Sequence, residues 1–188
     1  AIVDDGSCIL PEANDDCANA IGLLVDGVAT LVTNNCSTPD GAAGISWIDG
    51  TVENDVWYSF TAPTGGVLTI ETSDDGTTTF NDTQLAVYDV CGGTILADDD
   101  DAGAGLYSLL TFDCDAGTGL IGGNTYVIQV DGYNGDAGTC NITLSFTDRL
   151  GCTDTTFDNY DACATVDDGT CTNIVLGCIT LGACNYDS

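Results

Sequence analysis

The side chains available for chemistry are almost all carboxylates. The chain has 30 Asp and Glu residues, one basic residue, Arg149, and no histidine, giving a formal net charge of -29. Without histidine the commonest general base is missing, and Ser-His-Asp or Cys-His arrangements cannot form. With acids throughout the chain, a pair of carboxylates does not identify a glycosidase site. We therefore expect a protein that is not an enzyme.

Four consecutive aspartates, Asp98 to Asp101, form the densest acidic stretch. Adjacent carboxylates are costly unless they are hydrated or bind a metal, and calcium accepts six to eight hard oxygen ligands in flexible geometry. The stretch predicts either a calcium-binding loop or a solvated acidic loop tip.

The overall charge also limits the partners. Uncompensated carboxylates repel one another and weaken the compact state, so bound divalent metal, a salty habitat or both would offset them. Nothing in the composition could neutralise phosphates, which argues against nucleic acid and anionic membranes. No apolar run is long enough to span a bilayer, so we expect no membrane insertion.

A cysteine-rich segment from Gly151 to Cys171, GCTDTTFDNYDACATVDDGTC, starts again at Gly177 as GCITLGACNYDS. The first eight residues, AIVDDGSC, match its missing end, with one residue lacking opposite Cys163. The pattern predicts identical units that meet head to tail, either in one long polyprotein or as separate subunits. Such a heterologous contact propagates as a fibre unless its rotation closes.

The cysteine-rich copies carry a second set of acids. Their number suggests a calcium ion that stabilises a segment too small for a core, although the EF-hand order is absent. The alternative is a disulfide knot with aspartates in its turns. The candidate ligands are Asp154, Asp158, Asp161, Asp167 and Asp168 in the intact copy, and Asp4, Asp5 and Asp187 in the split copy.

The chain has 11 cysteines, and the usual Cys/His zinc spacing is absent. We therefore expect disulfides and an extracellular or cell-surface location. Because the count is odd, at least one cysteine is unpaired or bonds to another unit. The cysteines are Cys8, Cys17, Cys36, Cys91, Cys114, Cys140, Cys152, Cys163, Cys171, Cys178 and Cys184.

Alternating apolar residues predict an all-β fold, an antiparallel β-sandwich. The clearest runs lie at 55–63, 65–73, 124–133 and 142–147, and weaker ones at 28–33, 84–88, 94–97 and 107–112. Only Asp16 to Leu24 suggests a short helix. We expect the sandwich at 11–149 and a complete cysteine-rich repeat at 150–172. Residues 1–10 and 173–188 would be the two halves of another repeat.

Several segments carry a resemblance: NDDCANAI (14–21), DVWYSFTAP (55–63), NDTQLAVYDVCGG (81–93), TYVIQVDGY (125–133) and CNITLSF (140–146). They resemble a secreted β-sandwich module of marine and Bacteroidetes-type bacteria, similar to the jelly-roll CUB and pre-peptidase C-terminal (PPC) domains. The GCTD...NYD...VDDGTC unit resembles cysteine-rich repeats of large surface proteins from these bacteria. The resemblance implies surface, adhesive or stalk roles and no particular reaction.

The resemblance also implies particular residues. Asp98 replaces a cysteine of the module, so Cys91 is expected to pair elsewhere, with Cys114 as the partner. CUB-like calcium sites combine acids from neighbouring loops, and the matching residues are Glu53, Asp55, Asp82, Asp99, Asp100 and Asp131.

Some residues fit surface modification or sugar binding. Asn35, Asn81 and Asn141 begin N-x-S/T triplets, which also arise by chance. Thr155 and Ser188 resemble Bacteroidetes O-glycosylation sites. Trp47, Trp57, Tyr107 and Tyr133 could form a sugar-binding surface, or they could be core aromatics.

These observations favour a structural protein, the repeating unit of an extracellular filament or cell-surface stalk, assembled head to tail and stabilised by calcium and disulfides. The alternative is an adhesive module of a secreted multidomain protein that binds carbohydrate, such as surface glycans, or protein.

Overall fold

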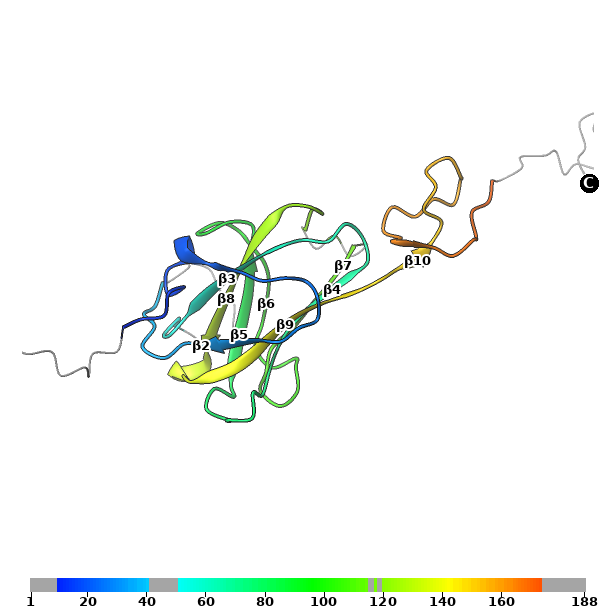
Figure 1. Ribbon diagram of the computed structural model, residues 1–188. Helices are drawn as coiled ribbons and strands as arrows, with labels where there is room; N and C mark the ends of the chain where they lie inside the picture. The colour runs from blue at the N-terminus through cyan, green and yellow to red at the C-terminus, as the bar shows by residue number, and fades with distance from the viewer. Residues whose placement is uncertain (1–9, 41–50, 115–116, 118–119, 174–188) are drawn as a thin grey trace, which may run out of the picture.

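The computed structural model describes residues 10–40, 51–114, 117 and 120–173, which form a β-sandwich followed by a small cysteine-rich unit (Figure 1). One sheet has the strand order β1-β3-β8-β5-β6 and the other β2-β9-β4-β7. The predicted all-β sandwich is therefore confirmed. No helix in these ranges is long and apolar enough to cross a membrane.

The strands lie where the sequence predicted them, although β5 and β8 are buried on both faces. The five-stranded sheet contains β1 (Ile21–Gly22), β3 (Val56–Thr61), β8 (Thr125–Gly132), β5 (Thr83–Tyr88) and β6 (Ile95–Asp99). The four-stranded sheet contains β2 (Thr30–Thr33), β9 (Thr139–Thr147), β4 (Val67–Ser73) and β7 (Leu109–Asp113). All pairs within the sandwich are antiparallel except β1 with β3. Each of the eight predicted runs overlaps one of these strands.

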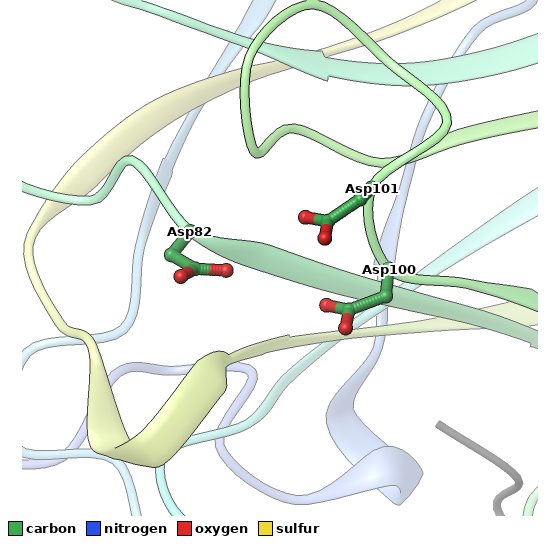
Figure 2. Close-up of side chains that lie close together, drawn as sticks. All are labelled: Asp82, Asp100 and Asp101. Carbon is green, nitrogen blue, oxygen red and sulfur yellow. The ribbon is translucent and has the colours of Figure 1, made fainter. Parts of the chain in front are cut away.

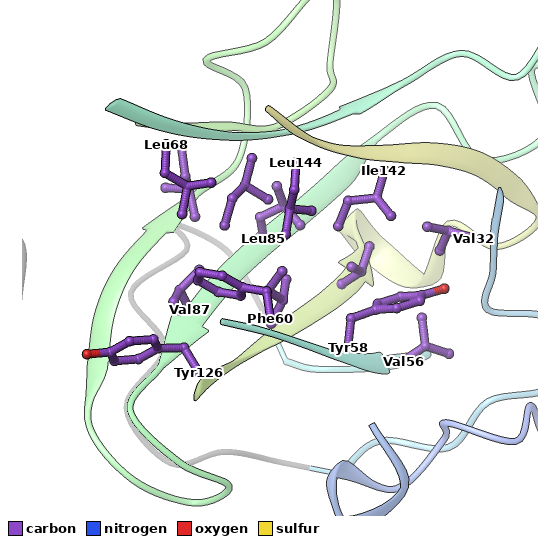
Figure 3. Packing of buried hydrophobic residues seen from close by; sticks show 14 of the residues in the cluster. Val32, Val56, Tyr58, Phe60, Leu68, Leu85, Val87, Tyr126, Ile142 and Leu144 are labelled. Carbon is purple, nitrogen blue, oxygen red and sulfur yellow. The ribbon is translucent and has the colours of Figure 1, made fainter. Parts of the chain in front are cut away.

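The core lies between the two sheets (Figure 3). Leu68, Ile142 and Leu144 of the four-stranded sheet face Phe60 and Leu85 of the five-stranded sheet, and all five are at most 2% exposed. Burial of such side chains supplies the main favourable free energy of the sandwich.

The outer face of the five-stranded sheet is also covered. Trp57 and Tyr88 pack there with ring centroids 5.5 Å apart, below a segment that contains Cys17 and Ala20. That segment holds only a 3-10 turn, η1 (Cys17–Asn19), in which the Asp16 side chain accepts from the Ala18 amide. The predicted helix from Asp16 to Leu24 is therefore wrong, because the chain leaves the turn at Ala20 and pairs as β1 with β3.

The disulfides connect parts that are distant in sequence. Cys17 bonds to Cys91, which follows β5. Cys114, which follows β7 of the opposite sheet, bonds to Cys163. The predicted pairing of Cys91 with Cys114 is therefore wrong, because the two residues follow strands of different sheets.

The cysteine-rich unit has little regular structure. Its β10 (Leu150–Gly151) and β11 (Val166–Asp167) pair in parallel, and a disulfide joins Cys152 to Cys171. Cys152 and Cys163 supply its buried side chains in the described residues. A unit with so little core depends on its covalent links and on contacts with the sandwich.

Candidate functional site

Three carboxylates meet at one end of the sandwich (Figure 2). Asp82 precedes β5, while Asp100 and Asp101 follow β6, and one oxygen of each lies within 4.8 Å of the others. Asp82 and Asp100 were among the predicted calcium ligands. Asp101 belongs to the acidic stretch but is not among the predicted ligands. We call these three residues the acidic triad.

Neighbouring aspartates shape the loops that carry the triad. Asp99 Oδ2 accepts from the backbone amides of Ala102 and Leu109, at 3.0 and 2.8 Å, and so closes the loop between β6 and β7. Asp136 Oδ2 accepts from the amides of Asn81 and Asp82, at 2.9 and 3.0 Å. These carboxylates act as turn caps, as aspartates commonly do.

A buried hydroxyl cluster fixes the backbone below the triad. Thr72, Thr83 and Ser108 lie within hydrogen-bonding distance of one another, and each is at most 2% exposed. Ser108 Oγ lies 2.9 Å from the carbonyl oxygen of Asp100. Because Thr83 is next to Asp82, the cluster connects both sides of the triad.

The triad has the electrostatics of a cation site. Partial burial first, and then the charges of Asp100, Asp101 and Asp136, raise the pKa of Asp82 above its usual value. The three side chains offer only hard oxygen donors, which suit calcium, and a divalent cation would offset their repulsion. Asp82 and Asp100 are half-buried and Asp101 is exposed, so one side of such a site faces solvent.

Three predicted ligands lie away from the triad and hold a different loop. Asp55 and Asp131 are fully buried. Asp55 accepts from the Asp40 amide, while Asp131 accepts from the amides of Glu53 and Asn54. Burial is the main factor that raises the pKa of both carboxyls. Glu53 is exposed, and its carboxylate contacts Thr51. A ligand role for these residues stays a prediction.

The aspartates of the cysteine-rich unit mostly cap its turns. Asp154 and Asp168 accept from the amide and hydroxyl of Thr156 and Thr170, respectively. Asp167 accepts from the Gly169 amide. Within the part of the chain that the structure describes, the acidic triad is the one group of three acids close enough for a shared ion. Calcium binding by Asp154, Asp158, Asp161, Asp167 and Asp168 remains a prediction.

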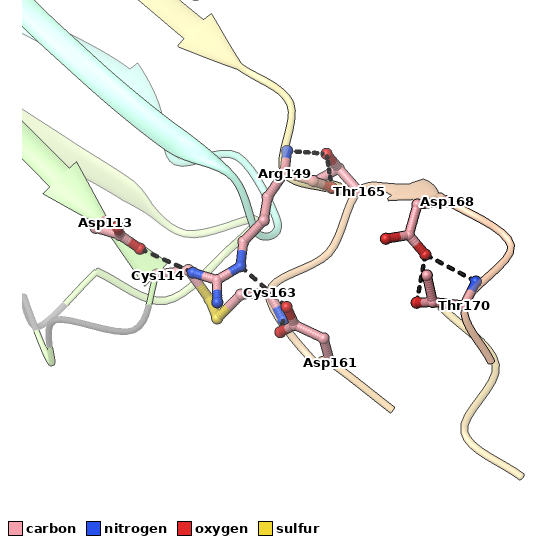
Figure 4. Close-up of polar contacts among 8 residues, drawn as sticks. All are labelled: Asp113, Cys114, Arg149, Asp161, Cys163, Thr165, Asp168 and Thr170. Carbon is pink, nitrogen blue, oxygen red and sulfur yellow. Dashed lines mark hydrogen bonds and ion pairs between the residues drawn. A yellow bond between two sulfur atoms is a disulfide. The ribbon is translucent and has the colours of Figure 1, made fainter. Parts of the chain in front are cut away.

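The sandwich and the cysteine-rich unit meet at a compact joint (Figure 4). Beside the Cys114–Cys163 disulfide, Arg149 donates through Nε to Asp161 at 2.9 Å, and its Nη1 lies 3.5 Å from Asp113 at the end of β7. The Gly66 amide donates to the Cys163 carbonyl. The only basic residue of the chain therefore links carboxylates of both parts. Sequence reasoning missed this joint, although the three cysteines of residues 150–172 implied one external partner.

The other predicted site residues are scattered over the fold or lie outside the described residues. Asn35, Asn81 and Thr155 are exposed, and Asn141 is half-buried on β9. Trp57 and Tyr107 are buried, which makes them core aromatics. Cys36 and Cys140 are free thiols. Asp4, Asp5, Asp187, Ser188, Trp47, Cys8, Cys178 and Cys184 lie outside the described residues.

The sandwich, the disulfides and the acid-rich loops define a secreted or cell-surface β-sandwich module. The chain belongs to the T9SS-associated family described as galactose binding domain-like, whose match spans residues 13–144. This family consists of non-catalytic binding domains, and no catalytic domain is detected in the chain. The expected extracellular or cell-surface location is confirmed by the family and by the disulfides.

Several solved structures are similar to the chain. The pre-peptidase C-terminal domain of a collagenase from Bacillus anthracis is 11% identical with a TM-score of 0.42, over 66% of this chain and 93% of that one. A family 35 carbohydrate binding module from Clostridium thermocellum is 17% identical with a TM-score of 0.31, over 62% and 85%. The K1 cleaved adhesin domain of Lys-gingipain from Porphyromonas gingivalis is 16% identical with a TM-score of 0.30, over 64% and 91%. No curated protein matches the chain.

Proposed function

We propose that the protein is a calcium-dependent glycan-binding module of a secreted multidomain surface protein. The observation that carries the proposal is the acidic triad, in which two loops bring three carboxylates together within 4.8 Å. Membership of a galactose binding domain-like family supports a carbohydrate as the ligand.

The chemistry of the triad favours one arrangement. Asp82, Asp100 and Asp101 would hold the ion, and the exposed side at Asp101 leaves room for further oxygen ligands. Calcium takes six to eight oxygen ligands, and three carboxylates need not supply all of them. Sugar hydroxyls or water can therefore complete its coordination shell. Because the chain has a net charge of -29, neutral sugars are favoured over anionic ones.

Calorimetric titration of the full chain with calcium, followed by screening on a glycan array with and without EDTA, tests the proposal. We expect calcium binding in the wild type and its loss in the D82N/D100N/D101N variant. Glu71→Gln, at an exposed position on β4, is the matched control and should bind as the wild type does. Calcium binding without glycan binding would remove the carbohydrate part of the proposal, and no calcium binding would remove all of it.

A structural role in a head-to-tail assembly is the second candidate. It would need a contact between chains of the kind that the sandwich and the cysteine-rich unit make within one chain, a disulfide flanked by an ion pair. Light scattering over a wide concentration range tests this role. Growth into large species would support it, and a constant monomer mass would contradict assembly from separate subunits.

A further inference from the structure

Two disulfides shorten the covalent path between Cys17 and Cys171, and we call this shorter connection the disulfide path. Along the chain, Cys17 and Cys171 are separated by about 150 residues, or roughly 500 Å when fully extended. A path through the Cys17–Cys91 and Cys114–Cys163 bonds needs only the residues from 91 to 114 and from 163 to 171. This path contains about 30 residues, or roughly 100 Å when extended.

The disulfide path connects the two sides of the molecule at which its ends would be pulled. The described chain begins at one side of the sandwich, shown in dark blue, and ends beyond the cysteine-rich unit on the opposite side, shown in orange (Figure 1). Tension between these ends follows the shortest covalent route once that route is taut. The loops closed by the disulfides, which contain β1 to β5 and β8 to β10, would then not be stretched along their backbone.

The two sandwich strands on this path are the edge strands of their sheets, and the third strand on it, β11, pairs only with β10. β6 pairs only with β5 at the edge of the five-stranded sheet, and β7 pairs only with β4 at the edge of the other. They can detach without breaking any other strand pair. Detachment of both strands would still leave β3, β8 and β5 paired with one another.

The joint strengthens the same route. Cys163 on the path is bonded to Cys114, and the Gly66 amide donates to its carbonyl oxygen at 2.9 Å. Arg149 binds Asp113 on the sandwich side and Asp161 on the other side. Tension that passes from β7 into the cysteine-rich unit therefore crosses a covalent bond that is supported by noncovalent contacts.

We propose that the protein is a tension-bearing module, in which two disulfides direct tension through residues 91–114 and 163–171 and limit how far the chain can extend. This role goes beyond glycan binding and does not rest on it. It suits a secreted or cell-surface protein whose neighbours pull on both sides of the sandwich.

Single-molecule force spectroscopy on the full chain, with a handle at each end, tests the proposal. Under oxidising conditions the segment between Cys17 and Cys171 should reach a length of only about 100 Å. When a reductant is added to the molecule already held under tension, that length should rise about fivefold. An oxidised chain that extends as far as the reduced one would overturn the proposal, and this comparison does not depend on a variant folding.

Cysteine variants assign the route. Without the Cys114–Cys163 bond, in C114S/C163S, the shortest path uses the Cys152–Cys171 bond and contains about 60 residues, or roughly 200 Å. Without the Cys17–Cys91 bond, in C17S/C91S, it contains about 100 residues, or roughly 350 Å. Cys36→Ser, at an exposed free thiol, is the matched control and should leave the wild-type length unchanged. Equal lengths in the wild type and both double variants would contradict the assigned route.

Discussion

Gln129 donates its side-chain amide to Asp55 Oδ2 at 2.9 Å, at a position where both residues are fully buried. Tyr88 donates to the other end of the same amide, at Gln129 Oε1. Asp55 in turn accepts from the backbone amide of Asp40. A buried carboxylate thus holds the backbone at Asp40, and we expect this contact to depend on pH.

The protein should become more stable as the pH falls from 7 to 5. Burial raises the pKa of Asp55 to about 6, although its hydrogen bonds with Asp40 and Gln129 lower that pKa in part. The native state therefore binds a proton more tightly than the unfolded chain. The stabilisation is fully present below the unfolded pKa and is lost as pH rises through about 6. In EDTA, we expect the free energy of unfolding to rise by about 1 kcal/mol from pH 7 to pH 5.

Denaturant unfolding at a series of pH values measures this effect. Asp55→Asn removes the titrating group while keeping its shape, so its stability should change less over the same interval. An equal slope in the variant and the wild type would show that Asp55 is not responsible.

Asp82→Asn should change the melting temperature in opposite directions with and without calcium. Because burial and the charges of Asp100, Asp101 and Asp136 raise the pKa of Asp82, a neutral side chain relieves repulsion when no cation is present. The melting temperature in EDTA should therefore rise, by no more than a few degrees. In calcium the variant should melt below the wild type, because it lacks a ligand and gains less from binding. Differential scanning calorimetry in both buffers gives the two values, and equal calcium-induced shifts would contradict the assigned role.

Gly66→Ala should destabilise both the sandwich and the joint. Gly66 has a φ of 65°, and a Cβ atom there would lie 2.5 Å from the Phe146 ring and 2.7 Å from the Thr147 carbonyl oxygen. We expect a loss of roughly 2 to 4 kcal/mol in the free energy of unfolding. Gly76→Ala is the control, since its φ is 90° but no atom lies within 4 Å of the added Cβ, and it should cost only about 1 kcal/mol. Equal losses would mean that close packing at Gly66 contributes nothing.

Arg149→Gln should loosen the cysteine-rich unit and leave the sandwich intact. Arg149 is about one-third exposed, so its two ion pairs should contribute about 1 kcal/mol or less. Amide hydrogen exchange should become faster across residues 150–172 and stay unchanged in β3, β5 and β8. Because an ammonium group cannot reproduce the forked geometry of a guanidinium, Arg149→Lys should restore protection only in part. Unchanged exchange in both variants would show that the disulfide alone fixes the joint.

Much of the sandwich could be predicted from the sequence, because strands such as β4 and β9 alternate buried and more exposed side chains. The turn at Cys17–Asn19 was mistaken for a helix, since its aspartates suit both a helix cap and an isolated turn. Disulfide partners such as Cys114 and Cys163 depend on which loops meet in space, which cysteine spacing does not determine. Asp101 was missed for a related reason, because only the folded loop shows which aspartates of the stretch face Asp82.

The sheet edges also restrict how copies of this chain can associate. β1 has two residues and β2 has four, while β6 carries Asp98 and Asp99 and β7 ends at Asp113. Short or charged edge strands oppose the addition of a strand from another molecule. We therefore expect the described sandwich to resist amyloid-type growth, and copies that associate through it to do so by side-chain surfaces or loops instead of a sheet continued across molecules.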